Sequence, residues 1–132
     1  MIVDTSALVA IITDEPERDA FVESLLADPD PRMSAGSFLE LCIVVDRLGS
    51  PVASRRVDDL MMGLGITVEP VAPDHVTVAR AAYRDFGRGS GHPAGLNFGD
   101  CFAYALASRS GEPLLFKGED FVHTDLRPAV TI

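Results

Sequence analysis

The sequence predicts an α/β fold with a mainly parallel sheet flanked by helices, and three observations support this class. Short apolar segments such as residues 2–3 and 114–116 are bounded by polar or turn residues, as buried strands are. Longer segments with helical apolar spacing lie between them. The 132 residues are enough to bury one core, and no linker interrupts them. Because strands that alternate with helices are typical of parallel sheets, we expect one α/β domain over residues 1–132.

The first half of the chain is expected to begin with a strand and then to be mostly helical. Ile2 and Val3 favour a strand, because β-branched residues fit extended backbone. Asp4, Thr5 and Ser6 favour the start of a helix, because their side-chain oxygens accept hydrogen bonds from free backbone N–H groups. After this first helix, the expected elements are helices over 14–26, 37–48 and 52–62 and a short strand over 32–34.

The second half is expected to continue with strand and helix units. A strand over 66–69 leads to a helix that Asp74 caps and that runs to residue 86. A glycine-rich loop over 87–95 precedes a helix that begins at Asn97 and ends near residue 109, with Gly111 after its end. A buried strand follows over 114–116, and residues 129–132 are expected to add a last strand.

The acidic composition restricts the classes of function. The formal net charge is −9 and the isoelectric point is about 4.6, which alone argues against nucleic-acid binding because phosphate contacts need positive charge. Two explanations remain: the protein avoids polyanions, or its acidic residues gather at a site that a divalent cation neutralises. Apolar residues make up 47% of the chain and the mean hydropathy is +0.19, which indicates an interface with a second copy or a partner.

Hydropathy and the acidic first residues predict a cytoplasmic protein. No apolar run approaches the roughly 18 residues of a membrane span, and the first residues are too acidic for a signal peptide. We therefore expect no membrane contact. Cys42 and Cys101 lie within apolar helical patterns, so we expect buried free thiols rather than a disulfide or a metal pair.

Glu40 occupies a position where a helix normally places an apolar residue. The residues one before, one after, three after and four after it are all aliphatic. An unpaired carboxylate on such a face costs several kcal/mol to bury. Either Glu40 lies partly exposed at the edge of the buried face, or the protein holds its carboxylate for a cation.

Asp100 has both a structural and a functional interpretation. Asn97 and Asp100 have the spacing of a capping box, in which each side chain accepts from the other residue's backbone N–H. The residues at three, four and seven positions after Asp100 are Ala103, Tyr104 and Ala107, so Asp100 also lies on a packing face. The two roles are compatible.

Two further carboxylates follow predicted strands. Asp4 comes directly after Val3, and Asp120 lies in the turn after the strand over 114–116, next to Glu119. Each has a simple structural alternative, as a helix cap for Asp4 and as a turn residue for Asp120. The spacing does not distinguish Asp120 from Glu119.

Considered together, these acidic residues predict a metal site. A parallel sheet places Asp4, Asp100 and Asp120 at one edge, and Glu40 can point there from a neighbouring helix. Carboxylates gathered without a cation repel one another and shift their pKa values. Oxygen ligands suit Mg²⁺ or Mn²⁺, and the sequence offers no Cys and His set for zinc. Such ions activate water and stabilise charge in phosphodiester hydrolysis.

Four segments of the chain carry a resemblance to a known family. They are Ile-Val-Asp-Thr-Ser-Ala-Leu at 2–8, Ser-Phe-Leu-Glu at 37–40, Asn-Phe-Gly-Asp-Cys-Phe-Ala-Tyr-Ala at 97–105 and Leu-Leu-Phe-Lys-Gly-Glu-Asp-Phe at 114–121. In this order they resemble the PIN-domain ribonucleases, in particular the VapC-type toxins of toxin–antitoxin pairs. The resemblance implies a three-layer PIN-like fold and a Mg²⁺-dependent endoribonuclease that cleaves RNA, is often a homodimer and is inhibited by a VapB-type antitoxin.

The resemblance also implies roles for individual residues. Asp4, Glu40 and Asp100 match the acidic triad of the family, and the fourth acid corresponds to Asp120 or Glu119, of which we favour Asp120. We expect Asp4 and Asp100 to ligate Mg²⁺ or Mn²⁺ directly and Glu40 and Asp120 to act through water.

Several polar residues near these acids are expected to support them. Thr5 and Ser6 can orient a carboxylate or bind metal-bound water, although capping is the simpler role, and Asn97 can hydrogen-bond the acids as well as cap its helix. Arg84, Arg88 and Lys117 are candidate contacts for RNA phosphates, with a solvated surface position as the alternative.

Two other classes of function remain as alternatives. A receiver-like signalling module that is phosphorylated with Mg²⁺ also has acids at strand ends, but it pairs two acids after the first strand, where this chain has Thr5 and Ser6. An inactive PIN-fold interaction protein has no use for a complete acidic set, which would then only be costly.

Overall fold

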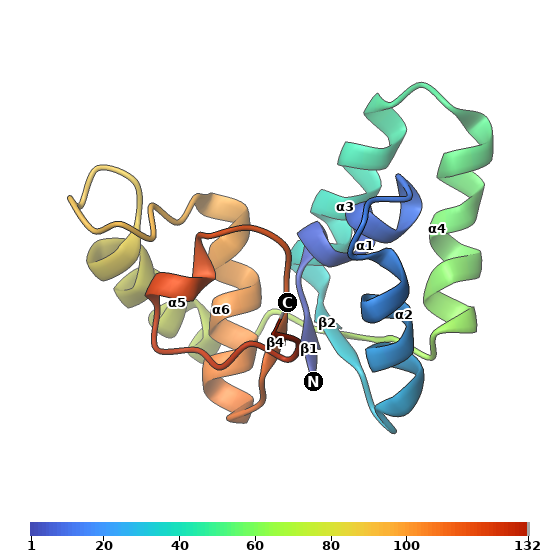
Figure 1. Cartoon of the computed structure of the whole chain (residues 1–132). Coiled ribbons are helices and arrows are strands. Elements are labelled where there is room, and N and C mark those ends of the chain that lie inside the picture. The colour runs from blue at the N-terminus through green and yellow to red at the C-terminus, as the bar shows by residue number, and fades with distance from the viewer. Residues whose placement is uncertain (132) are drawn as a thin grey trace.

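A four-stranded parallel sheet forms the centre of the computed structural model, which describes residues 1–131 (Figure 1). The strands follow the spatial order β3-β2-β1-β4, and each pair is parallel. Their bounds are Ile2–Val3 for β1, Arg32–Ser34 for β2, Thr67–Glu69 for β3 and Leu114–Leu115 for β4. The expected α/β class with a parallel sheet is confirmed.

Helices cover both faces of the sheet, which gives the three layers that the family resemblance implies (Figure 1). In Figure 1, α1 to α4 lie on one side of the sheet, and α5, α6 and the C-terminal segment lie on the other. The bounds are Thr5–Ile12 for α1, Arg18–Ala27 for α2, Ala35–Arg47 for α3, Pro51–Gly63 for α4, Pro73–Phe86 for α5 and Phe98–Ser110 for α6. A short 3₁₀ helix over Phe121–His123 follows β4.

The neighbouring strands β1 and β4 have apolar residues at every position because each strand faces two cores. Val3 and Leu115 belong to the apolar core beneath α1 to α4. Ile2 and Leu114 belong to the second core, with residues of α5 and α6. All four side chains are fully buried. Successive side chains of a strand point to opposite faces, so a sheet covered on both sides selects unbroken apolar segments.

Three expected elements differ from the structure. The second helix begins at Arg18 rather than at residue 14, because Asp14 has a left-handed φ of 56° and ends α1. The backbone N–H groups of Asp14 and Glu15 bond to the carbonyls of Ile11 and Ala10, which is the Schellman pattern. The prediction of a helix that begins at residue 14 is therefore wrong.

The cap of α5 and the last strand also differ from expectation. Ala72 is the N-cap of α5, and Asp74 lies in the first turn, where its carboxylate pairs with Arg109 at 2.7 Å. The backbone at Ala129 donates to the carbonyl of Leu114 at 2.8 Å, yet residues 129–131 form no strand. Ile132, the end of that expected strand, lies outside the described residues.

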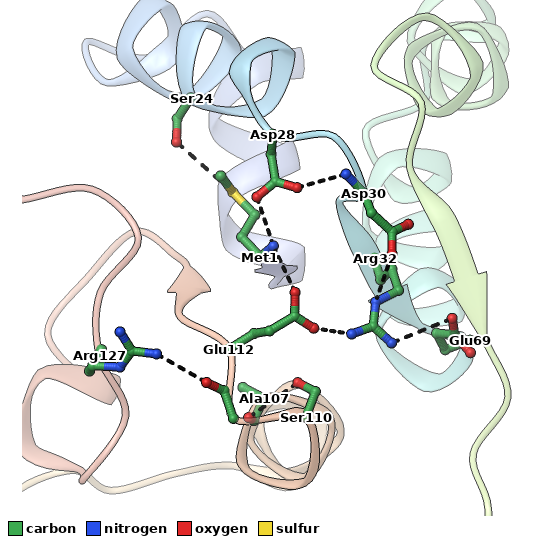
Figure 2. A network of polar contacts seen from close by, with 11 residues as sticks. Met1, Ser24, Asp28, Asp30, Arg32, Glu69, Ala107, Ser110, Glu112 and Arg127 are labelled. Carbon is green, nitrogen blue, oxygen red and sulfur yellow. Dashed lines mark hydrogen bonds and ion pairs between the residues drawn. The ribbon is translucent and has the colours of Figure 1, made fainter.

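A polar network closes the amino end of the sheet (Figure 2). The amino group of Met1 donates to Asp28 at 2.8 Å and to Glu112 at 3.1 Å. Arg32 donates to Glu112 and lies 3.7 Å from a carboxylate oxygen of Glu69. Cations and carboxylates thus alternate around the start of the central strands. These contacts tie β1 and β2 to the segment before β4.

The two cysteines are free thiols as expected, but only one of them is buried. Cys42 and Cys101 are both free, the first half-buried and the second buried. Over residues 1–131, no helix has the length and apolar character that crossing a membrane would need.

Candidate active site

Asp4 lies at the carboxyl end of β1 and caps α1 through one of its two carboxylate oxygens. Its Oδ2 accepts from the backbone N–H of Ser6 at 3.0 Å and from the Ser6 hydroxyl at 2.6 Å. Its Oδ1 is buried and has no hydrogen-bond partner among the described residues. The side chain is only 3% exposed. Asp4 therefore acts as a cap and still presents a free acceptor.

Thr5 and Ser6 join Asp4 to two distant segments. The Ser6 hydroxyl accepts from the backbone N–H of Lys117 at 3.0 Å, so it links α1 to the end of β4 while it donates to Asp4. The Thr5 hydroxyl donates to the carbonyl of Ser37 at 3.0 Å and so holds α1 against α3. Ser37 is fully buried, and its own hydroxyl has no hydrogen-bond partner among the described residues.

Asp100 forms the predicted capping box with Asn97 at the start of α6. The backbone N–H of Asp100 donates to Asn97 Oδ1 and the backbone N–H of Asn97 donates to Asp100 Oδ2, both at 2.9 Å. Asp100 is 9% exposed, and the residues on its face of α6, Ala103, Tyr104 and Ala107, are buried as expected. The capping box holds one oxygen of Asp100 in place.

Glu40 lies half-buried on α3, at a groove between α3 and α6. Its carboxylate packs over Gly99, where a Cβ atom would collide with it. The neighbouring Leu39 and Ile43 are 61% and 44% exposed, so part of this helix face forms a surface groove instead of core. The partly exposed position, which the sequence left open, is the observed one.

Asp120 and Glu119 are both exposed after β4, but their surroundings differ. The negative charge of Asp120 raises the pKa of Asp100, so Asp120 belongs to the acidic group. Glu119 instead lines a cavity with Glu17, Lys117 and Val130. The structure thus brings Asp120 toward the other acids and places Glu119 in a different cavity.

Burial and mutual repulsion both change the ionisation of the two buried acids. Burial is the main cause that raises the pKa of Asp4 to about 7, and the charges of Asp100 and Glu40 raise it further against the opposing bonds from Ser6. Burial also raises the pKa of Asp100 to about 6, with Asp120 and Glu40 adding to the effect. Each carboxylate would be easier to ionise beside a cation.

The donor chemistry of this group fits a hard divalent cation. Asp4 Oδ1 is a buried acceptor without a partner, and carboxylate oxygens are the ligands that Mg²⁺ and Mn²⁺ prefer. Within residues 1–131, no three His, Cys, Asp or Glu side chains lie close enough together to hold a metal ion as they stand. The fit therefore rests on the chemistry and burial of Asp4 and Asp100.

The candidate cations differ in whether they are already paired. Lys117 is bound to Glu15 and lies 3.2 Å from Glu17, and Arg84 lies 3.0 Å from Asp85. Arg88 is exposed, makes no ion pair within residues 1–131, and its charge lowers the pKa of Asp100. Of the three candidates, Arg88 alone faces the acidic group unpaired.

Sequence reasoning missed two residues of this region. Gly99 was passed over, although the close approach of Glu40 needs a residue without a side chain there. Ser37 was noted only as a helix start, although it is buried behind Thr5. Both residues lie in the segments that carry the family resemblance, Ser37 with Glu40 and Gly99 with Asp100, and this position was the available signal.

Comparisons with known proteins identify the family. The PIN domain family model matches residues 1–126. Ribonuclease VapC42 of Mycobacterium tuberculosis is 55% identical over 131 residues, which cover 99% of this chain and 100% of the relative. Ribonuclease VapC28 of the same organism is 53% identical over 130 residues, 98% of each chain.

Solved structures agree on the fold. Mycobacterium tuberculosis VapC20, described as a toxin that cleaves the sarcin–ricin loop, matches with a TM-score of 0.71 and 18% identity over 96% of this chain and 98% of that one. A toxin–antitoxin complex from Klebsiella pneumoniae matches with a TM-score of 0.71 and 16% identity over 99% and 98%. The chain belongs to the PIN-domain family, among its VapC members.

Proposed function

We propose that this chain is a metal-dependent endoribonuclease toxin that hydrolyses RNA phosphodiester bonds and is inhibited by a VapB-type antitoxin. The observation that carries the proposal is the buried pair Asp4 and Asp100 in a chain 55% identical to a VapC ribonuclease. Both side chains are buried, burial raises the pKa of each, and neither makes an ion pair within residues 1–131, which supports a site kept for a cation. A catalytic cation explains why such a costly arrangement is kept.

The proposed metal ligands are Asp4 and Asp100, with Glu40 and Asp120 acting through water. Mg²⁺ or Mn²⁺ would supply water activation and neutralisation of the charge that develops on the phosphate. Ser6 holds Asp4 Oδ2 and so leaves Oδ1 free to bind. The capping box uses Asp100 Oδ2, so its other oxygen takes no part in the capping box and is the one proposed to bind the metal.

The proposed partners follow from charge and from exposed apolar surface. An acidic site binds cations, so the antitoxin is expected to insert an Arg or Lys near Asp4 and Asp100 and so to exclude the metal. A homodimer is proposed because apolar side chains such as Met62 on α4, 83% exposed, lie on the surface. We further propose that residues 1–132 act as one domain in the cytoplasm.

The decisive experiment compares RNA ends in cells. The wild type and Asp4→Asn are expressed briefly, and new RNA 5′ ends are sequenced. Wild type is expected to generate new ends at a limited set of sites and Asp4→Asn to generate none. Asp46→Asn is the matched control, because Asp46 is an exposed carboxylate on α3 and should leave cleavage unchanged. Equal cleavage by Asp4→Asn and wild type would remove the proposed function.

The fourth acid is tested separately. Because Asp120 raises the pKa of Asp100 and Glu119 lines another cavity, Asp120→Asn is expected to reduce cleavage more than Glu119→Gln. Initial rates of RNA cleavage in Mg²⁺ measure both losses. A larger loss in Glu119→Gln would assign the position to Glu119.

A further inference from the structure

Two glycines lie where helices α3 and α6 approach each other. Gly36 is in the first turn of α3, and Gly99 is in the first turn of α6. A Cβ atom on Gly36 would lie 2.5 and 2.8 Å from two ring carbons of Phe102 on α6. A Cβ atom on Gly99 would lie 2.6 Å from Cδ and 2.9 Å from Oε1 of Glu40 on α3. Each helix thus provides a glycine on which a side chain of the other helix packs.

The two glycines differ in what an added methyl group would displace. Non-bonded carbon atoms pack at about 3.5–4.0 Å, so a methyl group at either position would move its neighbour. At Gly36 the neighbour is the ring of Phe102, and the atoms in the way include Cγ, which moves only if the side chain changes rotamer. At Gly99 the neighbour is the carboxyl end of Glu40, which rotates about its own side-chain bonds. Gly99→Ala is therefore expected to keep the fold and to move a carboxylate.

Few other interactions restrict the carboxylate of Glu40. Within residues 1–131, Glu40 makes no ion pair, and it lines a groove of about 440 Å³ together with Gly99. The carboxylate therefore faces open space as well as the helix. The first backbone N–H groups of a helix have no helical acceptor and favour a nearby negative charge. Packing on Gly99 and the polarity of the start of α6 are thus the interactions that fix its position.

The position of this carboxylate sets its spacing from Asp100. Gly99 is directly before Asp100, and the capping box with Asn97 fixes one oxygen of Asp100. The carboxylate of Glu40 thus packs on the residue next to a proposed metal ligand. A methyl group on Gly99 would change the spacing of the two carboxylates and leave Asp100 in its capping box.

We propose that Gly99 is a positioning residue for Glu40. Because it has no side chain, the carboxylate of Glu40 packs on the first turn of α6 and is held at a fixed distance from Asp100. The inference rests on the proposed ribonuclease function, in which Glu40 acts through water. Gly36 has the complementary role: it accommodates Phe102 and so keeps the two helices at the separation that Glu40 needs.

The first test compares Gly99→Ala with Gly63→Ala. Gly63 is also helical and ends α4, but a Cβ atom there would meet nothing within 4 Å. The probe is a synthetic RNA that contains a cleavage site mapped in cells, in Mg²⁺. Gly99→Ala should lower kcat about 10- to 100-fold and change KM less than about 2-fold, because a misplaced group costs rate rather than substrate binding. Gly63→Ala should match wild type in both constants.

A double-mutant cycle tests whether Gly99 acts through Glu40. In the Glu40→Gln background, Gly99→Ala should change kcat less than about 2-fold, because the carboxylate that it displaces is already absent. General damage to the start of α6 would instead reduce kcat by the same factor in both backgrounds. Equal factors would overturn the proposal.

Two further readouts do not depend on activity. Crystal structures of wild type and Gly99→Ala should place the Glu40 carboxylate about 1 Å or more apart while the backbone of α6 superimposes. Gly99→Ala should also keep a melting temperature near that of wild type. If it does not fold, Gly99→Ala combined with Glu40→Ala decides, because this pair removes the colliding carboxylate and should melt with the Glu40→Ala single variant. A pair that stays unfolded would show that the methyl group collides elsewhere, which would overturn the proposal.

Failure of the positioning role and failure of the proposed function are distinct outcomes. An unchanged kcat in Gly99→Ala, or a Glu40 carboxylate that keeps its wild-type position, would overturn the positioning role and leave the nuclease intact. If wild type itself does not cleave RNA in Mg²⁺ or Mn²⁺, the proposed function fails, and the two crystal structures decide whether Gly99 sets the position of Glu40.

Discussion

The two ends of the central sheet hold acids in opposite electrostatic surroundings. At the amino end, hydrogen bonds from the amino group of Met1 and the backbone of Asp30 outweigh burial and lower the pKa of Asp28. At the carboxyl end, burial raises the pKa of Asp4 to about 7 and of Asp100 to about 6. The same residue type is thus neutralised by the protein at one end and left without a counter-ion at the other.

This difference separates structural acids from acids kept for a ligand. The amino-end network contains its own cations, so its carboxylates contribute to folding without any added ion (Figure 2). At the carboxyl end, the hydrogen bonds of Asp4 and Asp100 come from caps and a hydroxyl, further acids lie nearby, and Arg88, whose charge acts on Asp100, makes no ion pair within residues 1–131. Stability should therefore depend on added cations at the carboxyl end only.

The largest expected effect follows from neutralising one acid at the carboxyl end. Asp100→Asn keeps an acceptor for the backbone of Asn97, because Asn and Asp are similar caps. We expect a folded protein whose RNA cleavage falls at least about 100-fold, as for loss of a group that stabilises developing charge. Glu40→Gln should behave similarly. Cleavage rates in Mg²⁺ measure the loss, and circular dichroism checks that each variant is folded. Near wild-type cleavage by either variant would show that the substituted residue is purely structural.

The second largest expected effect is the stabilisation of the protein by a metal ion bound at the carboxyl end of the sheet. Mg²⁺ or Mn²⁺ at about 100 times its dissociation constant is expected to add about 2–3 kcal/mol to the free energy of unfolding, because ligands that bind the native state stabilise it. Asp4→Asn should lose most of this gain. Scanning calorimetry over millimolar concentrations measures it. A melting temperature that does not respond to metal in wild type would contradict the metal site.

Breaking the amino end should reduce stability and spare activity. Arg32→Met leaves Glu112 with one cation fewer and should cost about 1–2 kcal/mol, between the values for exposed and buried pairs. Urea unfolding measures the loss. Arg18→Met is the matched control, because the partners of Arg18 are exposed and its loss should be smaller. A fall in cleavage by folded Arg32→Met would show that the two ends are coupled.

The smallest expected effect is on pH dependence. The folded pKa values of about 7 and about 6 exceed the unfolded value of 3.8, so the native state binds more protons between about pH 4 and 7 and stability falls as pH rises through this range. Without metal, raising the pH from 6 to 7.5 should cost about 1.5 kcal/mol, most of it from Asp4. Asp4→Asn should flatten the profile.

Asp28 gives the opposite sign, which sharpens the comparison. Its pKa is lowered, so its stabilisation is complete above about pH 4 and is lost as the pH falls through its folded pKa. Asp28→Asn should therefore flatten only the acidic limb of the stability curve. Saturating Mg²⁺ should remove the pH dependence of stability near neutral pH and leave the acidic limb of the stability curve unchanged. A stability that rises with pH from 6 to 7.5 in metal-free wild type would contradict the assignment.

Local patterns predicted the parts of the site that depend on local physics. Ile2, Val3 and Asp4 form the strand and cap that their side chains favour, and the spacing of Asn97 and Asp100 forms the capping box. These features depend on residues within four positions of one another. The sequence therefore located two of the four acids in their observed local structure.

Features that depend on distant segments were not available from the pattern. The aliphatic neighbours of Glu40 indicated a buried face, but Leu39 and Ile43 line a surface groove, because hydropathy does not say which apolar face another element covers. The Ser6 link to the backbone of Lys117 spans 111 positions, and no local rule predicts it. Asp14 ends α1, although the residues that begin at Asp14 favoured the start of a helix. The reason is that Asp accepts the left-handed backbone conformation observed there.

The central position of β1 delays the assembly of the site during synthesis. β1 is made first, yet it lies between β2 and β4, and Ile2 pairs with Leu114 and Val3 with Leu115. Contacts so distant in sequence form slowly, and a growing chain must hold its first strand without one neighbour until residue 115 has left the ribosome. A chain interrupted before Asn97 has Asp4 and Glu40 but lacks Asp100 and the segment that bonds Ser6. Translation products that end before Asp100 therefore carry no complete acidic site.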